Sequence, residues 1–269
     1  MVRANIEIIY ENADILVVNK PTGVSVTKDR TGAESILPIL QRQLARLAPE
    51  LRLVHRLDKD ASGVMMLAKN IAAQRQLTRQ FEQRSLKKLY LALVAGTPSQ
   101  PQGRIEAPIA PSRKQPQKMV IDCSGGKYAL TQWRLLADFG NLSLLAVSPM
   151  TGRTHQIRVH LQSVGMPIAI DPLYGSQTPL FLSHLKADYR LGRNQVENPL
   201  IDRLTLHAYQ LELSPPDLAE PLRFVAGLDK RFSATLKMLT KYGPKGQQAF
   251  ADQNMLPDIL AARRLSTEW

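Results

Sequence analysis

The sequence predicts an α+β fold for this chain of 269 residues. Short apolar runs bounded by turn residues are typical of strands, and they dominate the chain, whereas helical periodicity is confined to a few separate segments. The helices do not alternate regularly with the strands, which argues against a doubly wound βαβ sheet. Hydrophobic residues make up 44% of the chain, enough for a sizeable core, so one main domain is expected.

Apolar runs and alternating patterns mark the predicted strands. The first two flank a turn and form a hairpin that ends at KPTG, residues 20–23. In the run around Tyr90 successive side chains face opposite sides, and both sides are apolar, so both should be covered. DFGN, residues 138–141, is interpreted as a hairpin turn. The predicted strands are 6–9, 15–18, 51–57, 64–68, 89–94, 128–136, 142–147 and 204–213.

Four helices are predicted from apolar residues at helical spacing: 35–47, one around 73–81, one beginning at Thr154, and one around 232–239. Thr154 is expected to cap the third helix and Gly165 to end it. The Pro-rich, basic segment 104–118 predicts an exposed loop. No internal repeat is present, and residues 174–202 lack clear periodicity.

The charge balance points to a polyanionic partner. Lys plus Arg number 35 against 23 Asp plus Glu, which gives a net charge of +12 and a pI near 10.0. Cys123 is the single cysteine, so an intrachain disulfide and a Cys-based zinc site are excluded. The N-terminus lacks the pattern of a signal peptide, and no run approaches the ~20 apolar residues of a transmembrane helix. We expect a cytoplasmic monomer with no membrane partner.

Two polar stretches stand out from this background. HRLDKDASG, residues 55–63, is a charged elbow between two predicted strands, and rigid strands position such an elbow well for chemistry. By itself it could equally be a solvated turn. TGRTHQIRVHL, residues 151–161, gathers Arg153, His155, Arg158 and His160 and calls for an anionic group to answer them.

Together with KKLYLALV (87–94), DPLYG (171–175) and LHA (206–208), these stretches resemble, in their order, the RluA family of pseudouridine synthases, which isomerise uridine within RNA. The resemblance spans roughly residues 6–227. It implies a central, mostly antiparallel sheet around a basic cleft. We expect a catalytic domain over 1–243 and a partly helical tail over 244–269, which lies outside the resemblance. Ala61 departs from the family pattern DxxTSG, and the small N-terminal RNA-binding module of many relatives is expected to be missing.

The resemblance implies a role for each matching residue. Asp58 acts on the ribose as nucleophile or base, Tyr90 stacks on the base, and Arg158 keeps the carboxylate ionised, because a guanidinium within ~4–6 Å lowers an Asp pKa. Ile157 packs on the base, and Arg56 fills the gap left by the flipped nucleotide. Taken alone, Tyr90 could be a core aromatic and Arg158 a solvated helix residue.

Other candidates concern RNA contact and metals. Six further residues are candidate RNA-binding groups: His55, Arg153, His155, Arg113, Lys114 and Lys118. His155 and His160 are five residues apart and do not share a helical face, and HExxH is absent, so no metal and no other cofactor is expected.

Two alternatives were weighed against this interpretation. A protein kinase is suggested by HRLD and DFG, but Leu57 interrupts HRD and Gly63 stands where the kinase pattern requires Asn. A non-catalytic RNA-binding protein with the same fold remains the second hypothesis. Against it stands Asp58, because a carboxylate facing phosphates repels RNA.

Overall fold

The computed structural model describes residues 5–28, 32–45, 50–192, 195–214 and 220–267. It divides into two compact units. Unit 1 comprises Met1–Leu89 and His207–Gly227, and unit 2 comprises Tyr90–Leu206 and Leu228–Trp269. The chain therefore passes from unit 1 to unit 2 at Tyr90, returns to unit 1 at His207, and enters unit 2 again at Leu228. The predicted boundary at residue 243 stays a prediction.

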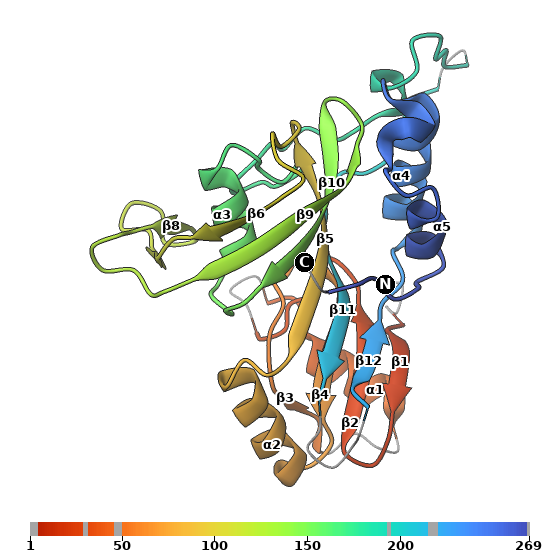
Figure 1. Cartoon of the computed structure of the whole chain (residues 1–269). Coiled ribbons are helices and arrows are strands. Elements are labelled where there is room, and N and C mark those ends of the chain that lie inside the picture. The colour runs from red at the N-terminus through yellow and green to blue at the C-terminus, as the bar shows by residue number, and fades with distance from the viewer. Residues whose placement is uncertain (1–4, 29–31, 46–49, 193–194, 215–219, 268–269) are drawn as a thin grey trace. The chain divides into compact units, whose positions relative to one another are not determined.

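Unit 1 is built on a mixed sheet in the order β1-β2-β4-β11-β12, with β3 paired to β4 (Figure 1). All pairs are antiparallel except β4 with β11, where His207 lies opposite Ser62. The strands are β1 (Glu7–Glu11), β2 (Ile15–Lys20), β3 (Arg52–Leu53), β4 (Ser62–Ala68), β11 (Leu206–Leu213) and β12 (Leu222–Val225). The predicted strand 51–57 is thus wrong beyond its first residues, because the charged elbow leaves the sheet after Leu53.

Two helices belong to unit 1. Helix α1 (Ile36–Leu44) follows Ser35, and its predicted end at residue 47 lies outside the described residues. Helix α2 (Ile71–Glu82) begins where the Asn70 side chain accepts the Ala73 N–H at 2.8 Å, a capping contact. Its buried residues Ala73 and Leu77 lie one turn apart, which confirms the predicted apolar face, and α2 packs against β3 and β4.

Unit 2 contains an antiparallel sheet in the order β5-β10-β9-β6, and β7 with β8 forms a separate hairpin (Figure 1). Its strands are β5 (Lys87–Ala95), β6 (Gln102–Glu106), β7 (Ile109–Pro111), β8 (Met119–Ile121), β9 (Leu130–Asp138) and β10 (Leu142–Pro149). The prediction of a loop over 104–118 is wrong for β6 and β7. Strand β6 carries exposed polar residues, and β7 is only three residues long, so the apolar signal of a strand is weak in both.

The helices of unit 2 flank this sheet: α3 (Gln156–Ser163), the 3₁₀ turns η2 (Leu182–His184) and η3 (Gly246–Ala249), α4 (Lys230–Tyr242) and α5 (Met255–Leu260). The expected cap Thr154 is wrong, because His155 is the N-cap residue and adopts a left-handed conformation with φ 52°. Gly165 does follow the helix with φ 77°. Helix α4 ends at Tyr242, directly before Gly243. The predicted hairpin turn at residues 138–141 is confirmed, because β9 and β10 pair on either side of it.

The C-terminal segment packs within unit 2. Phe250 lies edge-on to Phe139 with ring centroids 5.7 Å apart, and Lys245 forms an ion pair with Asp138. Ile259 in α5 is fully buried. These contacts explain why Phe139, inside a turn, is buried.

The junction of the charged elbow with β4 requires glycine at position 63. Gly63 has φ +114°, and a Cβ there would lie 2.1 Å from the Ala208 carbonyl oxygen on β11. We predict that Gly63→Ala lowers the free energy of unfolding by about 3 kcal/mol or prevents folding. Gly96→Ala is the matched control, since Gly96 has φ +81° but no described atom within 4 Å of the new Cβ, and it should cost about 1 kcal/mol. Equal losses in urea unfolding would contradict the steric argument.

Candidate active site

Asp58 lies in the elbow between β3 and β4, and a buried lysine at the end of β2 holds this elbow. Lys20 is fully buried, and its Nζ donates hydrogen bonds to the carbonyl oxygens of Lys59 (3.0 Å), Val24 (2.9 Å) and Pro21 (3.0 Å). Burial lowers the pKa of Lys20 to about 8, while the carboxylates of Asp60 and then Asp58 oppose that shift. In the sequence, Lys20 marks only the end of a predicted hairpin, and no motif indicates its contact with the elbow.

Two further contacts join the turn after β2 to the elbow. The Gly23 N–H donates to the Lys59 carbonyl at 3.0 Å, and the Thr22 hydroxyl donates to the Asp60 carbonyl at 2.6 Å. The carbonyl groups of Lys59 and Asp60 are therefore fixed by the KPTG turn. Asp58, the preceding residue, is half-buried.

The end of the elbow is anchored to β11. The His207 Nε2 lies 3.0 Å from the Ala226 carbonyl, which can only accept, so Nε2 carries the proton. The His207 Nδ1 is then an acceptor for the Ser62 hydroxyl at 2.8 Å. This buried contact explains the pairing of the SG and LHA segments that the resemblance brought together.

His55 packs inside unit 1. Its ring stacks on Phe81 of α2 at 4.5 Å, and its Nε2 accepts the Met66 N–H at 3.0 Å. Burial, with Lys88 nearby, lowers the pKa of His55 to about 3, so the ring is neutral at physiological pH. These contacts give His55 a structural role, and its assignment to RNA binding stays a prediction. Arg56, the next residue, is exposed.

In unit 2 the central feature is a buried ion pair. Arg158 on α3 is 3% exposed and Asp171 is fully buried. The Arg158 Nε and one Nη donate to the two carboxylate oxygens of Asp171 at 2.7 and 2.8 Å. The Asp171 carboxylate also accepts the N–H groups of Leu173 and Tyr174, at 2.9 and 3.1 Å. Asp171, in the DPLYG segment, thereby fixes the plane of the guanidinium.

Tyr174 extends this arrangement. Its ring lies 5.0 Å from the Arg158 guanidinium carbon, within the range of a cation–π contact. Its hydroxyl oxygen accepts the Met119 N–H at 2.6 Å and also lies 2.9 Å from His155 Nδ1. The β7–β8 hairpin is thus tied to α3 through one phenol.

A second buried network accounts for Gln156 and His160. The Gln156 amide accepts from the Thr151 hydroxyl (2.6 Å) and the Arg153 N–H (3.0 Å), and donates to the Thr131 hydroxyl (2.9 Å). Thr131 in turn lies 2.9 Å from His160 Nδ1, and His160 Nε2 lies 2.9 Å from a backbone carbonyl. Burial lowers the pKa of His160, so this histidine is a neutral structural group.

Tyr90 and Ile157 also belong to unit 2. Tyr90 on β5 pairs with Val147 on β10 and is half-buried, and Ile157 on α3 is buried. Helix α3 packs against β10 and β9. Unit 2 therefore carries Tyr90, Ile157 and Arg158 on adjacent elements, while unit 1 carries Asp58.

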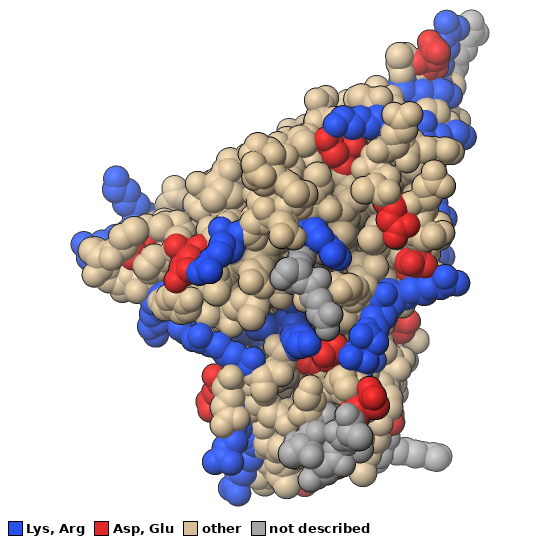
Figure 2. Space-filling view, viewed as in Figure 1, with Lys and Arg blue, Asp and Glu red and all other residues tan. Residues whose placement is uncertain are grey.

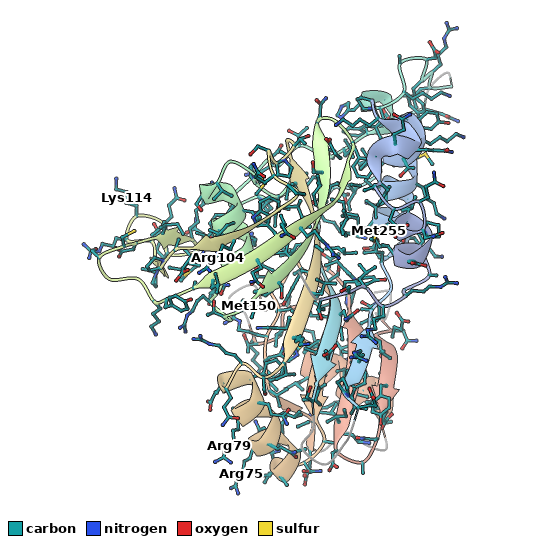
Figure 3. The ribbon with its side chains drawn as sticks, in the orientation of Figure 1. Arg75, Arg79, Arg104, Lys114, Met150 and Met255 are labelled. Atoms are coloured by element: carbon teal, nitrogen blue, oxygen red, sulfur yellow. The ribbon has the colours of Figure 1, made fainter. Side chains whose placement is uncertain are left out.

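The predicted RNA-binding cations lie on or near the β7–β8 hairpin. Arg113 and Lys114 are exposed between the two strands, and Figure 3 shows Lys114 extending away from them. The Lys118 Nζ lies 5.9 Å from the centre of the Tyr174 ring, and the Arg153 Nε donates to the Tyr128 carbonyl at 3.0 Å.

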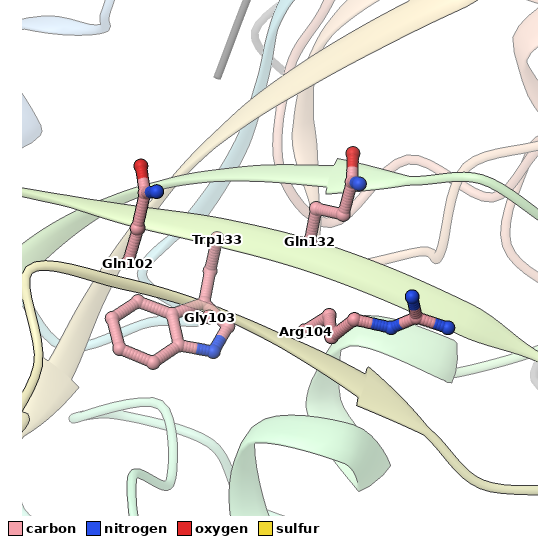
Figure 4. Close-up of a pocket in the computed structure, with 5 residues that line it drawn as sticks. All are labelled: Gln102, Gly103, Arg104, Gln132 and Trp133. Atoms are coloured by element: carbon pink, nitrogen blue, oxygen red, sulfur yellow. The ribbon is translucent and has the colours of Figure 1, made fainter.

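Strands β6 and β9 line a shallow recess of about 260 Å³ (Figure 4). Gln102 and Gln132 point to one side of the strands and the Trp133 indole to the other. A Cβ on Gly103 would lie 2.7 Å from the indole, so glycine is required under this ring. Arg104 is paired with Glu106. None of the predicted catalytic residues lines the recess.

Within the described ranges, no three His, Cys, Asp or Glu side chains are grouped as metal ligands. No helix in those ranges is long and apolar enough to cross a membrane.

Asp171 should be tested through stability. We predict that Asp171→Asn lowers the free energy of unfolding by about 3 kcal/mol, because it leaves the Arg158 charge buried without its carboxylate. Glu34→Gln is the control, since it breaks only the exposed Arg42–Glu34 pair and should leave the stability nearly unchanged. Chemical unfolding of both variants measures the difference, and similar values would argue against the role of burial.

Comparison with known proteins agrees with this geometry. A family model for RNA pseudouridylate synthase matches residues 14–163. A ribosomal large subunit pseudouridine synthase D from Nitrosomonas europaea is 37% identical over 87% of this chain, which spans only 65% of that relative's length. A ribosomal large subunit pseudouridine synthase C from Yersinia pestis is also 37% identical, over 87% of this chain and 69% of the relative. The solved human RNA pseudouridylate synthase domain containing 4 superimposes with a TM-score of 0.65 at 29% identity, covering 87% of this chain and 92% of the other. The chain belongs to the RNA pseudouridylate synthase family.

Proposed function

We propose that this protein isomerises specific uridines in structured RNA to pseudouridine. The observation that carries the proposal is Asp58, which stands at the family's aspartate position in an elbow held by the buried Lys20. A loop that only turned the chain would not require a buried ammonium beside it. The proposed non-catalytic alternative gives no reason for a carboxylate at this position.

The reaction rearranges one nucleotide without a co-reactant. The bond between N1 of the base and C1′ of the ribose breaks, the base rotates, and C5 bonds to C1′. The proton that leaves C5 is balanced by the proton that N1 gains. A stacked base cannot rotate in place, so it must be flipped out, at a cost of a few kcal/mol in stacking and pairing.

The chain supplies side chains for each requirement. We assign Asp58 to the ribose, as nucleophile or base, and Tyr90 and Ile157 to the base. We assign Arg158 as the positively charged group of the site. The bidentate contact with Asp171 supports this assignment, because it fixes the orientation of the guanidinium before RNA binds.

The two relatives described above are ribosomal large subunit pseudouridine synthases, which favours a uridine in ribosomal RNA as the target, with transfer RNA as the second candidate. The exposed cations of the β7–β8 hairpin fit a phosphate backbone. The proposed RNA-binding residues are Arg56, Arg113, Lys114, Lys118, Arg153, His155 and His55. We further propose that the protein acts in the cytoplasm, as a monomer and without a cofactor.

The test is the appearance of pseudouridine in RNA. Unmodified ribosomal and transfer RNA are incubated with the protein, and pseudouridine is mapped by position. New pseudouridine at defined uridines supports the proposal. RNA binding without any pseudouridine, by folded protein, favours the non-catalytic alternative.

Asp58→Asn should abolish pseudouridine formation and leave RNA affinity equal or higher, because the amide keeps the shape and removes the charge that repels phosphate. Asp188→Asn, at an exposed position in unit 2, is the control and should retain activity. A melting measurement must show that both variants are folded. If folded Asp58→Asn still reacts at more than about a thousandth of the wild-type rate, a loss of less than roughly 4 kcal/mol, Asp58 is not the essential group.

Tyr90→Phe separates stacking from proton transfer. The variant keeps the aromatic area, so RNA affinity should stay within about twofold while turnover is lost. Single-turnover kinetics, with the protein in excess over the RNA and above the Kd, measures the chemical step directly. Turnover at the wild-type rate would reduce Tyr90 to a stacking platform.

A further inference from the structure

Helix α2 of unit 1 presents a basic face that the proposed site does not use. Residues 71–88 contain five cations and one acidic residue: Arg75, Arg79, Arg84, Lys87 and Lys88 against Glu82. Arg75 and Arg79 are both exposed and lie four residues apart, about 6 Å along the helix axis, on the same face. Figure 3 shows them extending from α2 away from the strands of unit 1.

These charges are only partly neutralised by the protein. Neither Arg75 nor Arg79 forms an ion pair with any residue that the structure describes. Lys87 is paired, with its Nζ 3.3 Å from a Glu212 carboxylate oxygen. Burial, and to a smaller extent the neighbouring Arg84, lowers the pKa of Lys88 to about 8. An anion bound at Arg75 and Arg79 would neutralise two charges that the described part of the protein leaves unpaired.

The remaining side chains of this face fit a nucleic-acid backbone. Gln76 and Gln83 are exposed and carry amides that can bond to phosphate oxygens or ribose hydroxyls. Guanidinium groups bind phosphate through two parallel hydrogen bonds. The one aromatic residue of α2, Phe81, stacks inward on His55, so the face lacks the aromatic anchors typical of protein interfaces. Figure 2 shows Lys and Arg side chains gathered where α2 lies.

We propose that the arginine face of α2, defined by Arg75 and Arg79 with Gln76 and Gln83 beside them, binds the phosphate backbone of the RNA substrate. The proposal rests on the proposed function and adds a contact surface to it. The stack of Phe81 on His55 at 4.5 Å connects this helix to the elbow that carries Asp58. RNA held on α2 is thus bound by an element that packs directly against the catalytic loop of the same unit.

The test compares two double variants of the full-length protein. Arg75→Gln/Arg79→Gln removes two charges from the arginine face, and Lys230→Gln/Lys237→Gln removes two from exposed positions on α4. The probe is an unmodified large-subunit ribosomal RNA transcript, with unmodified transfer RNA as a second probe. Affinity is measured from ~0.05 to ~0.5 M salt. Both variants must melt as wild type does.

We expect the arginine variant to lose about 1.4 from the slope of log affinity against log salt, since each phosphate contact contributes about 0.7 on single-stranded RNA. The affinity loss at ~0.1 M salt should be roughly 25-fold, because the salt curves converge near ~1 M. The α4 variant should stay within about twofold of wild type. An unchanged slope in the arginine variant, or equal losses in the two variants, would overturn the proposal.

The outcome is separable from the proposed function. Pseudouridine formation by the wild-type protein is measured on the same RNA. If pseudouridine forms and the arginine variant binds normally, the surface is wrong and the function stands. If RNA binding depends on Arg75 and Arg79 but no pseudouridine forms, the surface stands and the function is wrong.

Discussion

The buried ammonium of Lys20 is the contact on which the geometry of unit 1 around Asp58 depends. Burying an unpaired ammonium costs several kcal/mol, and an ammonium has three N–H donors to satisfy. Lys20 meets three carbonyl oxygens at 2.9–3.0 Å, so every donor is used. Those carbonyls and the nearby carboxylates favour the charged form and oppose the effect of burial on the pKa. A loop held this way cannot shift without leaving a buried charge unsatisfied.

Unit 2 follows the same physical rule with different groups. Arg158 is satisfied by Asp171, whose carboxylate also accepts two backbone N–H groups, and Tyr174 covers the guanidinium. On the same helix, the side chains of Gln156 and His160 both form hydrogen bonds with the Thr131 hydroxyl. The dense polar motif at residues 151–161 therefore serves packing, whatever its part in the proposed reaction. Most of its polar members stabilise the position of α3, which fixes where Arg158 is presented.

The sequence predicted the parts of the fold whose burial is one-sided or complete. Strand β5, helix α2 and helix α4 follow from regular apolar spacing, and the α+β class with a mostly antiparallel sheet is confirmed. Strand β6 was missed because its exposed positions are polar, and β7 because it is only three residues long. The cap of α3 was misplaced, since a left-handed His155 is favoured by its contact with Tyr174 and not by local propensity.

Among the site residues, sequence order identified the chemical groups but not their supports. Asp58, Tyr90 and Arg158 were named from motifs, and their assignment stays a prediction. Lys20 and Asp171 were not named, because each acts through contacts between residues distant in sequence. One signal was available: a lysine at the end of an apolar strand, directly before Pro and Gly, must either leave the core or find acceptors there.

In the chain, helix α2 lies between two strands that carry residues of the proposed site. It follows β4, which carries the end of the elbow, and it precedes β5, which carries Tyr90. Phe81 contacts the elbow through His55, whose Nε2 is engaged by the Met66 N–H and whose low pKa keeps the ring uncharged beside Lys88. Because that ring stays neutral, it adds no repulsion to a region already crowded with cations. The stack can therefore hold α2 against the elbow that carries Asp58, while the exposed arginine face of the helix keeps its positive charge.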